Sequence, residues 1–383
     1  MKIAILTQPL HTNYGGILQA YALQTFLENR GHEVIVVNRD YNFKLSPKLL
    51  LRRLGSVAKC IIRSVLLNQK EYCVMNPFSP YYHTKWTGYN VLPFVKKYIK
   101  QSKEIRSSQA LRKYFKKYKF DCYIVGSDQV WRPCYSPCIT DFFLKELAEG
   151  NKSIKVAYAA SFGTDKWEFS CLETNECSAL AKLFDAVSVR EESSIKLCRE
   201  YLGVPSQHLL DPTMLIDKNQ YICLIEEDNI PKSEGNLFCY ILDANDELNR
   251  VVASLIKDGY KPNYASLNIE STKSNPRPYQ MSVQKWLRGF YDADLIVTDS
   301  FHACVFAIIF EKPFIVWDNV GRGSARFESL LKQFDNHERL VHSYDDFIEK
   351  RNNLLSALDT ARVQELLYYW KEKTKVFFES IKL

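Results

Sequence analysis

The sequence predicts an α/β protein with two Rossmann-like, doubly wound domains that face a cleft, followed by a C-terminal helical segment. Three observations predict this fold class. The chain has 383 residues, enough for two domains of ordinary size. Short apolar runs alternate with amphipathic helical stretches, the pattern of parallel sheets covered by helices. No repeat, low-complexity tract or membrane-length apolar run interrupts the alternation.

The N-terminal domain is predicted over residues 1–212, and it begins with a β-α-β unit. A strand is expected over Lys2–Thr7, where the pattern does not fit a signal peptide. A helix over Ile17–Arg30, ended by Gly31, and a strand over Glu33–Asn38 complete the unit. The further strands are predicted at Cys122–Gly126, Lys155–Ala160, Ala186–Arg190 and His208–Leu210, and the further helices at Gln109–Lys119, Glu176–Phe184 and Glu192–Leu202.

Asp211-Pro212-Thr213 ends this series, because proline biases Asp211 towards an extended backbone. We expect a linker over 213–235 and a C-terminal α/β domain over 236–344, with helices from 345 to 383. The strands of this domain are predicted at Leu237–Leu242, Leu295–Thr298 and Phe314–Trp317, and its helices at Glu247–Lys257, Ser282–Tyr291, Ala303–Phe310 and Arg326–Phe334.

The composition excludes several classes of protein. With 46% hydrophobic and 25% charged residues, the chain is neither disordered nor fibrous. Its 11 cysteines include no Cys-x-x-Cys pair, which favours a reducing cytoplasm over a disulfide framework or a zinc site. We therefore expect a cytoplasmic protein without a metal site.

The net charge of +7 is unevenly distributed. Residues 41–118, a predicted basic helical insertion, hold 17 Lys and Arg but only two acidic residues, Glu71 and Glu104. This imbalance indicates an anionic partner such as a nucleic acid, a membrane surface or a phosphorylated substrate. A basic amphipathic helix over Leu50–Leu66 either lies on anionic lipid or packs on its own domain. For the basic helix Gln109–Lys119 we favour a solvated face, since no nucleic-acid motif surrounds it.

Polar residues follow the predicted strands of the first domain, where ligands bind in open parallel sheets. After the first strand, Asn13-Tyr14-Gly15-Gly16 and Gln19 offer either a close backbone approach to a ligand or only a tight turn. Asp128, Gln129 and Trp131 suit a sugar, with Asp128 as a base; the alternative is a turn cap and a core indole.

Two later runs add candidate cations and a histidine. Arg190 ends a strand and is either a fork for an anion or the partner of a neighbouring glutamate. After the strand Leu295–Thr298, Asp299 or Ser300 can cap a helix whose first turn carries His302. That helix start favours an anion beside the imidazole, which can hold a phosphate or donate a proton.

Together these motifs resemble the polysaccharide pyruvyl transferase family. The resemblance covers most of the chain in seven runs in family order. They are residues 13–23, 125–131, Ala159-Ala160-Ser161-Phe162-Gly163, Ser188-Val189-Arg190-Glu191, Leu210-Asp211-Pro212-Thr213, Thr298-Asp299-Ser300-Phe301-His302 and Ser324-Ala325-Arg326. The resemblance implies a GT-B-like fold. It also implies transfer of a pyruvyl group from phosphoenolpyruvate to two sugar hydroxyls, giving a ketal in surface or capsular polysaccharide biosynthesis.

The resemblance also implies roles for particular residues. His302, Asp128 and Arg190 are the expected catalytic residues, as acid, base and carboxylate clamp. The donor is expected at Arg190, Ser300, His302, Ser324 and Arg326. The acceptor is expected at Asn13, Tyr14, Gly15, Gly16, Gln19, Asp128, Gln129, Trp131, Ser161 and Phe162. Some members have arginine where this chain has Ser300, and Arg326 or Arg322 is the candidate to compensate.

No cofactor beyond phosphoenolpyruvate as donor substrate is expected. The acceptor sugar has a polyprenyl phosphate as one candidate carrier, which would place the protein at the inner face of the cytoplasmic membrane. No nucleic-acid partner is expected. Two other functions compete with this one: a nucleotide-sugar glycosyltransferase of the same architecture, and a non-catalytic protein that binds a membrane or nucleic acid through the basic block.

Overall fold

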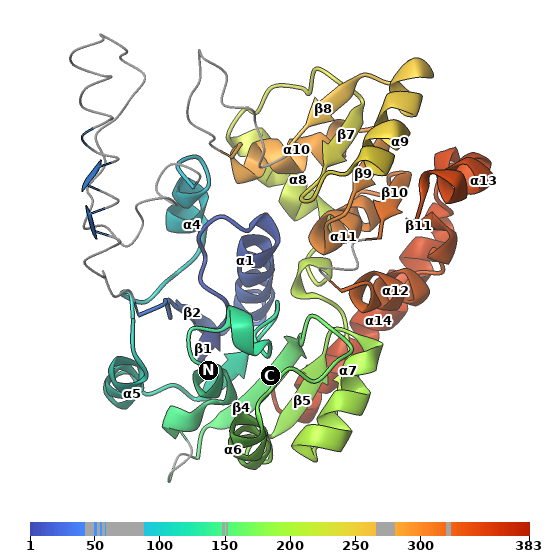
Figure 1. The fold of residues 1–383 in the computed structure, drawn as a ribbon. Coiled ribbons are helices and arrows are strands. Elements are labelled where there is room, and N and C mark those ends of the chain that lie inside the picture. Colours follow the sequence, from blue (N-terminus) through green and yellow to red (C-terminus); the bar gives the residue numbers. More distant parts are fainter. Residues whose placement is uncertain are drawn as a thin grey trace.

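Two parallel β-sheets, one in each half of the chain, form the frame of the computed structural model (Figure 1). Helices cover both sheets, and the helix that begins near residue 14 lies where the two halves meet. The structure describes residues 1–42, 50, 51, 54, 55, 58, 88–147, 150, 152–265, 280–318 and 323–383.

The first sheet has the strand order β2-β1-β3-β4-β5-β6. Its strands are β1 (Lys2–Leu6), β2 (Glu33–Val37), β3 (Cys122–Val125), β4 (Ile154–Ala160), β5 (Ala186–Val189) and β6 (Gln207–His208). The register pairs Leu6 with Val37 on one side and with Val125 on the other. The carboxyl ends of β2, β1 and β3 therefore lie side by side, and so do the loops that follow them.

The helices of this half are α1 (Tyr14–Glu28), α4 (Leu92–Tyr98), α5 (Ser108–Lys117), α6 (Cys171–Ala181) and α7 (Glu192–Leu197). Both α1 and α6 begin earlier than the sequence predicts, because caps set their starts. Asn13 accepts a hydrogen bond from the Gly16 N–H at the start of α1. Ser170 and Glu173 form a reciprocal capping box at the start of α6.

The second sheet has the strand order β11-β10-β9-β7-β8. Its strands are β7 (Leu237–Tyr240), β8 (Pro262–Tyr264), β9 (Leu295–Thr298), β10 (Phe314–Trp317) and β11 (Leu340–Val341). Its helices are α8 (Lys218–Glu227), α9 (Asp246–Lys257), α10 (Val283–Asp292), α11 (Phe301–Ile309), α12 (Ala325–Gln333), α13 (Tyr344–Leu355) and α14 (Thr360–Ser380). Short 3-10 helices lie at Pro133–Tyr135, Ile139–Phe143, Lys145–Leu147, Pro212–Met214 and His337–Arg339, and a π-helix at Cys198–Leu202.

One apolar core crosses from the first half to the second. The Tyr14 ring stacks on Trp286 with ring centres 5.0 Å apart, and the Tyr14 hydroxyl donates to the Met281 carbonyl at 2.7 Å. Helix α14 then returns the chain to the first sheet (Figure 1), where Phe378 packs on Tyr158 and Phe26. These contacts join the halves across the region where their strand ends meet.

Part of the predicted basic insertion lies outside the described residues. This applies to the amphipathic helix predicted over Leu50–Leu66, of which only a few positions are described. Arg322, far from the insertion in the sequence, also lies outside the described residues. The described helix α5 buries Leu111 and Phe115 and exposes its lysines. Within the described ranges, no helix combines the length and the apolar character that a membrane crossing requires.

Candidate functional site

A small cavity of about 80 Å³ lies between the two halves of the chain. Loops after β1 and β3 form one side, and the start of α11 and Arg326 of α12 form the other. The lining residues are Asn13, Asp128, Gln129, Arg132, Tyr135, Leu242, Asp299, Ser300, Phe301, His302 and Arg326. The cavity thus sits beyond the carboxyl ends of strands, the usual place for a ligand in open parallel sheets.

Asp128 enters the cavity from the first half. Its backbone adopts φ 66°, an uncommon conformation for a residue other than glycine, and it is 4% exposed. The Asn13 side-chain amide donates to Asp128 Oδ2 at 3.2 Å, and the Gln129 N–H donates to Oδ1 at 2.9 Å. Gly16 lets α1 approach, since a Cβ there would lie 3.1 Å from Asp128 Oδ2. The carboxylate is therefore held in one orientation.

Gln19 holds the loop that carries Asp128 from the side of the protein interior, and it does not line the cavity. Its side-chain oxygen accepts from the Ser127 N–H at 3.0 Å, and its amide donates to Thr7 Oγ1 at 2.7 Å. Gln19 is fully buried. Its observed contacts fix the loop that carries Asp128, whereas the sequence predicts contact with the acceptor.

His302 enters from the second half, in the first turn of α11, and is 7% exposed. A Cβ at Gly15 would lie 2.0 Å from His302 Nδ1, so only glycine lets the imidazole rest against the first turn of α1. Helices α1 and α11 consequently begin close together, with their free N–H groups near the same place. Ser300 occupies the N-cap position of α11 without a side-chain cap, and Asp299 instead accepts from the Leu242 and Asp243 N–H groups.

Asp211 joins His302 to Arg190, a role that sequence reasoning missed. Asp211 Oδ2 lies 3.6 Å from His302 Nε2 and accepts from Arg190 Nη1 at 3.1 Å. Thr213 donates twice to Oδ1. Burial opposes ionisation of Asp211, but the neighbouring His302 imidazole, followed by Arg190, lowers its pKa below the usual range. The signal in the sequence was a carboxylate just after a strand, which the proline break obscured.

Arg190 is buried and does not line the cavity. Its guanidinium donates to Asp211 and to Glu191 and lies 3.9 Å from Asp128 Oδ1. Burial acts to lower the pKa of Arg190, but these carboxylates raise it overall. Arg190 covers the ring of Phe301 at 4.3 Å, and it is Phe301 that faces the cavity. The ion pair with Glu191 is thus present, and direct contact with a ligand in the cavity is not indicated.

Arg326 and Arg132 are the arginines that line the cavity. Burial, and then repulsion from Arg190, lower the pKa of Arg326 to about 10, so it stays a cation at neutral pH. Arg132 is held by two hydrogen bonds to Glu168 at 2.8 and 2.9 Å. Ser324 points elsewhere, since its hydroxyl donates to Asp318 at 2.5 Å.

A larger cavity of about 380 Å³ adjoins the first. The two share Asn13, Asp128, Gln129 and Tyr135 in their linings. The other residues around the larger cavity are Gln8, Pro9, His11, Thr12 and Tyr41. Because both cavities include Asp128, a molecule in each would meet at this carboxylate.

Seven residues predicted to contact an acceptor do not line either cavity: Tyr14, Gly15, Gly16, Gln19, Trp131, Ser161 and Phe162. Tyr14 lies in the packing between the halves, as described above. Trp131 is fully buried, stacks on Phe143 and donates to the Phe142 carbonyl. Ser161 donates to Glu191 at 2.6 Å, and Phe162 packs in the core beside Trp131. Gly15 and Gly16 act through the close approaches given above.

Tyr135 and Tyr41 provide the aromatic surface that was predicted for Trp131. Tyr135 is 43% exposed and Tyr41 is 46% exposed, and the Tyr41 hydroxyl donates to the Tyr135 carbonyl. The sequence did not single them out. Trp131 and Tyr135 lie in one loop, and the sequence alone does not show which of the two rings faces the core and which faces the solvent. That difference is set by packing on Phe142 and Phe143.

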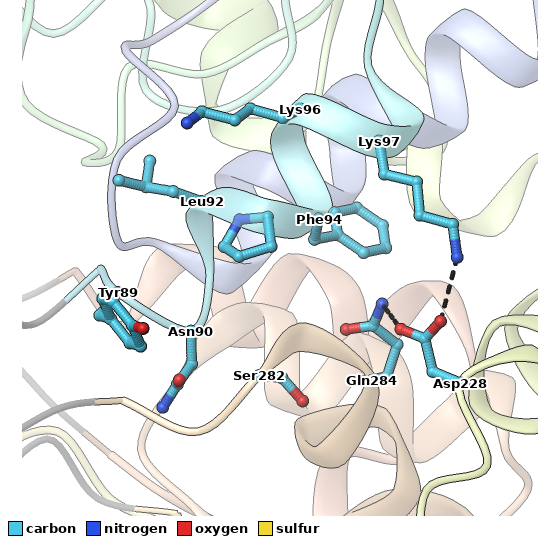
Figure 2. A pocket seen from close by; sticks show the side chains of 10 residues that line it. Tyr89, Asn90, Leu92, Phe94, Lys96, Lys97, Asp228, Ser282 and Gln284 are labelled. Atoms are coloured by element: carbon cyan, nitrogen blue, oxygen red, sulfur yellow. Dashed lines mark hydrogen bonds and ion pairs between the residues drawn. The ribbon is translucent and has the colours of Figure 1, made fainter.

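A cavity of about 580 Å³ lies away from these residues, between α4 and α10 (Figure 2). Its carboxylate, Asp228, is bonded to Lys97 at 3.0 Å and to Gln284 at 2.6 Å. Residues within 89–97 of the basic insertion line it, but none of the seven motifs that resemble the family reaches it. We therefore assign the candidate site to the smaller, charged cavity despite its size.

Among the described residues, no group of three or more His, Cys, Asp or Glu is arranged to hold a metal ion. The cysteines in the described ranges are all free thiols. The polar groups at the cavity include one imidazole, two guanidinium groups, two aspartates, the amides of Asn13 and Gln129 and the start of α11.

Comparisons with known proteins agree with this architecture. The family model "Polysaccharide pyruvyl transferase" matches residues 13–319. No curated protein matches the sequence. UDP-GlcNAc 2-epimerase from Neisseria meningitidis bound to UDP-GlcNAc is similar in structure, with a TM-score of 0.50, 10% identity and coverage of 98% of this chain and 99% of that one. The fold is therefore GT-B, which confirms the predicted fold class.

Two further structures are similar at lower scores. UDP-N-acetylglucosamine 2-epimerase from Rickettsia bellii gives a TM-score of 0.47 and 10% identity, over 99% of this chain and 96% of that one. Arabidopsis thaliana UGT89C1 complexed with quercetin gives 0.47 and 10%, over 99% and 95%.

Proposed function

The chain belongs to the polysaccharide pyruvyl transferase family, and on that premise we propose that it moves a pyruvyl group from phosphoenolpyruvate to two hydroxyls of a sugar. The product is a cyclic ketal in a surface or capsular polysaccharide. One observation carries the proposal: His302 and Arg326 from one half of the chain share a small cavity with Asp128 from the other.

The cavity fits a small anionic donor better than a nucleotide sugar. Its volume of about 80 Å³ is well below the roughly 300–1,000 Å³ typical of pockets for larger organic ligands. Arg326 supplies a buried cation, and the start of α11 supplies N–H groups beside Ser300. Phosphoenolpyruvate is a compact anion with a phosphate and a carboxylate. Arg326 can bind one of these groups as a planar fork, and Arg132, whose guanidinium is bonded to Glu168 and Gln129, adds positive charge at the cavity.

His302 is the proposed acid. Protonated, it delivers a proton to the methylene carbon of phosphoenolpyruvate, and the cation formed at C2 is attacked by the first sugar hydroxyl. Asp128 accepts the proton of that hydroxyl. Phosphate then leaves, and the second hydroxyl closes the ketal. The two hydroxyl protons balance the new methyl hydrogen and the proton on the released phosphate.

We assign Arg190 a positioning role, in place of the carboxylate clamp expected from the family resemblance. Its three carboxylate neighbours and the cover of Phe301 place it behind the cavity. There it holds Asp211, which faces His302, and Asp128, which faces both cavities. Preorganised charges of this kind lower the barrier without contacting substrate.

The larger cavity is the proposed binding site of the sugar acceptor. Its exposed tyrosines, Tyr41 and Tyr135, offer apolar faces to a sugar ring, while Gln129 and Asn13 offer hydrogen bonds to hydroxyls. A polyprenyl phosphate carrier at the inner membrane face would suit the basic composition of residues 41–118. This carrier is proposed on charge alone.

Phosphate release is the measurement that tests the proposed function. The full chain is incubated with phosphoenolpyruvate and a panel of methyl and lipid-diphosphate-linked pyranosides that carry neighbouring free hydroxyls. We expect acceptor-dependent phosphate release and a ketal detected by mass spectrometry. Thermal unfolding measured beside it should show stabilisation by phosphoenolpyruvate and none by UDP- or GDP-sugars. The reverse pattern of stabilisation would instead support a glycosyltransferase.

A further inference from the structure

Ketal formation needs two proton acceptors on the acceptor side, because both sugar hydroxyls lose their protons. Asp128 lies where the two cavities meet and accounts for one of them. Once protonated by the first hydroxyl, a carboxylate with a single orientation cannot accept the second proton until it has passed the first one on. A second group at the larger cavity would complete the proton balance.

His11 and Asp40 form a pair beside that cavity. His11 lies in the loop after β1, and Asp40 follows β2, its parallel neighbour. His11 lines the larger cavity together with Asp128. His11 Nε2 lies 3.1 Å from Asp40 Oδ1, which is hydrogen-bond distance. The topology of the first sheet therefore brings an imidazole and a carboxylate to the acceptor side.

Asp40 is held in place more firmly than an ordinary surface aspartate. It is 5% exposed, its N–H donates to the Ile105 carbonyl at 2.8 Å, and its Oδ1 accepts from the Tyr41 N–H at 2.7 Å. Its carbonyl accepts from the Arg39 guanidinium, which also bonds to Asp141. A carboxylate fixed in this way fixes the ring of the histidine that donates to it.

The orientation of this pair suits a proton acceptor. When Nε2–H donates to Asp40, the lone pair of the neutral imidazole is on Nδ1, and the ionised carboxylate stabilises the imidazolium that forms when Nδ1 takes a proton. Histidine bound in this way to a carboxylate is a recurrent arrangement for a general base.

We infer that the His11–Asp40 pair accepts the proton of the second sugar hydroxyl as it closes the ketal. The bond from C2 to the phosphate oxygen is already broken at this point; the new bond joins the hydroxyl oxygen to C2 of the pyruvyl group, and its proton passes to His11 and from there, through solvent, to the released phosphate. His302 and Asp128 keep the roles given above. The inference rests on the proposed function, since a different donor chemistry would not need a second acceptor.

The surroundings of His11 define how a pH experiment is read. Among the described residues, the ionisable groups that contact the His11–Asp40 pair or share its cavity include Asp40, the Arg39 guanidinium on the Asp40 carbonyl, Tyr41, Tyr135 and Asp128. A group that acts as a base must be unprotonated to accept a proton, so removal of the His11 imidazole should alter the acidic limb of the rate profile.

The test compares His11→Gln with the wild type, and uses His32→Gln, a half-buried position that lines neither cavity, as the control. Glutamine can still donate to Asp40 but does not accept a proton near neutral pH. We expect kcat to fall at least tenfold, the KM for phosphoenolpyruvate to stay within twofold, and the acidic limb of the kcat profile to change. Asp40→Asn should lower kcat in the same direction, and His32→Gln should match the wild type.

Two results would overturn the inference. One is a kcat for His11→Gln within twofold of the wild type with an unchanged acidic limb. The other is a fall in kcat accompanied by a higher KM for phosphoenolpyruvate and a lower melting temperature, which would show a structural role. If the wild type releases no phosphate with any acceptor on the panel, the proposed function itself fails, and the two failures are thereby distinguished.

Discussion

At the scale of single residues, the site depends on Asp211, a carboxylate that touches no ligand cavity. It lies between Arg190 and His302 and has both as partners. Removing one partner of a buried ion pair is strongly destabilising, because it leaves a buried charge without compensation. The same contacts that lower the pKa of Asp211 hold the imidazole at the start of α11.

Asp211→Asn should lower the free energy of unfolding by about 3–5 kcal/mol at pH 7, the range for breaking a buried ion pair. Because the folded pKa of Asp211 is lowered, its contribution to stability is present above the unfolded pKa of about 3.9 and is lost as the pH falls through the folded value. The difference from the wild type should therefore shrink below about pH 4. Urea unfolding across this range measures it.

The surface pair of Arg362 and Asp335 provides the control for that experiment. Asp335→Asn should change the free energy of unfolding by less than about 1 kcal/mol. An Asp211→Asn protein as stable as this control would contradict the account of Asp211.

Gly15 supports a second prediction at this scale. Gly15→Ala places a Cβ against the imidazole of His302, so it should destabilise the protein by about 1–3 kcal/mol through overpacking. In the His302→Ala background the imidazole is gone but the Cβ of residue 302, which would lie 2.6 Å from the added Cβ, remains, so the same change should cost clearly less without becoming neutral. A double-mutant cycle of unfolding free energies measures the coupling. Equal losses in both backgrounds would show that Gly15 acts independently of His302.

At the scale of elements, apolar runs predicted the central strands well. The helix that was missed begins at a capping box, which the apolar pattern does not show. Strands β9 and β10 have the predicted bounds, because each is a buried apolar run between turns. Helix α8 lies within the stretch predicted as a linker, where Asp217 and Gln220 form a capping box. Strands β8 and β11 are short, and β8 begins with Pro262, so neither has an apolar run long enough to detect.

Helix α14 carries a prediction for the element that returns to the first sheet. Phe378 is fully buried against Tyr158 and Phe26, whereas Val376, on the same helix, is 62% exposed. Phe378→Ala should cost about 3–5 kcal/mol of unfolding free energy, and Val376→Ala less than about 0.5 kcal/mol. Chemical denaturation measures both. Equal effects would mean that α14 does not hold the halves together through this face.

At the scale of the whole molecule, the site exists only where the two halves meet. The sequence predicted that polar residues follow the strands and that His302 begins a helix, and the structure brings His302, Ser300, Arg326, Asp128, Gln129 and Asn13 to one cavity. The sequence did not predict that Arg190 is covered by Phe301, or that Trp131 faces the core while Tyr135 faces outward. Those outcomes depend on side-chain packing between segments far apart in the chain. The hydrophobic periodicity of strands and helices carries no information about such packing.

The positive charge of the molecule is divided between the cavity and the basic insertion. The cations at the cavity, Arg326 and Arg132, come singly from separate elements. The basic insertion is largely distinct from them, and the lysines of its described helix α5 are exposed. Placement of charge therefore says more about the site than the net charge of +7.

The measurement that tests the central claim most directly is phosphate release from phosphoenolpyruvate by His302→Ala, with His337→Ala at an exposed position as the matched control. The wild type and His337→Ala should release phosphate in the presence of an acceptor at equal rates. His302→Ala should remain folded by circular dichroism and release phosphate at least a hundredfold more slowly, because general acid catalysis typically contributes about 10²–10⁴-fold. Turnover by His302→Ala within a few fold of the control would remove His302, and the cavity around it, from the reaction.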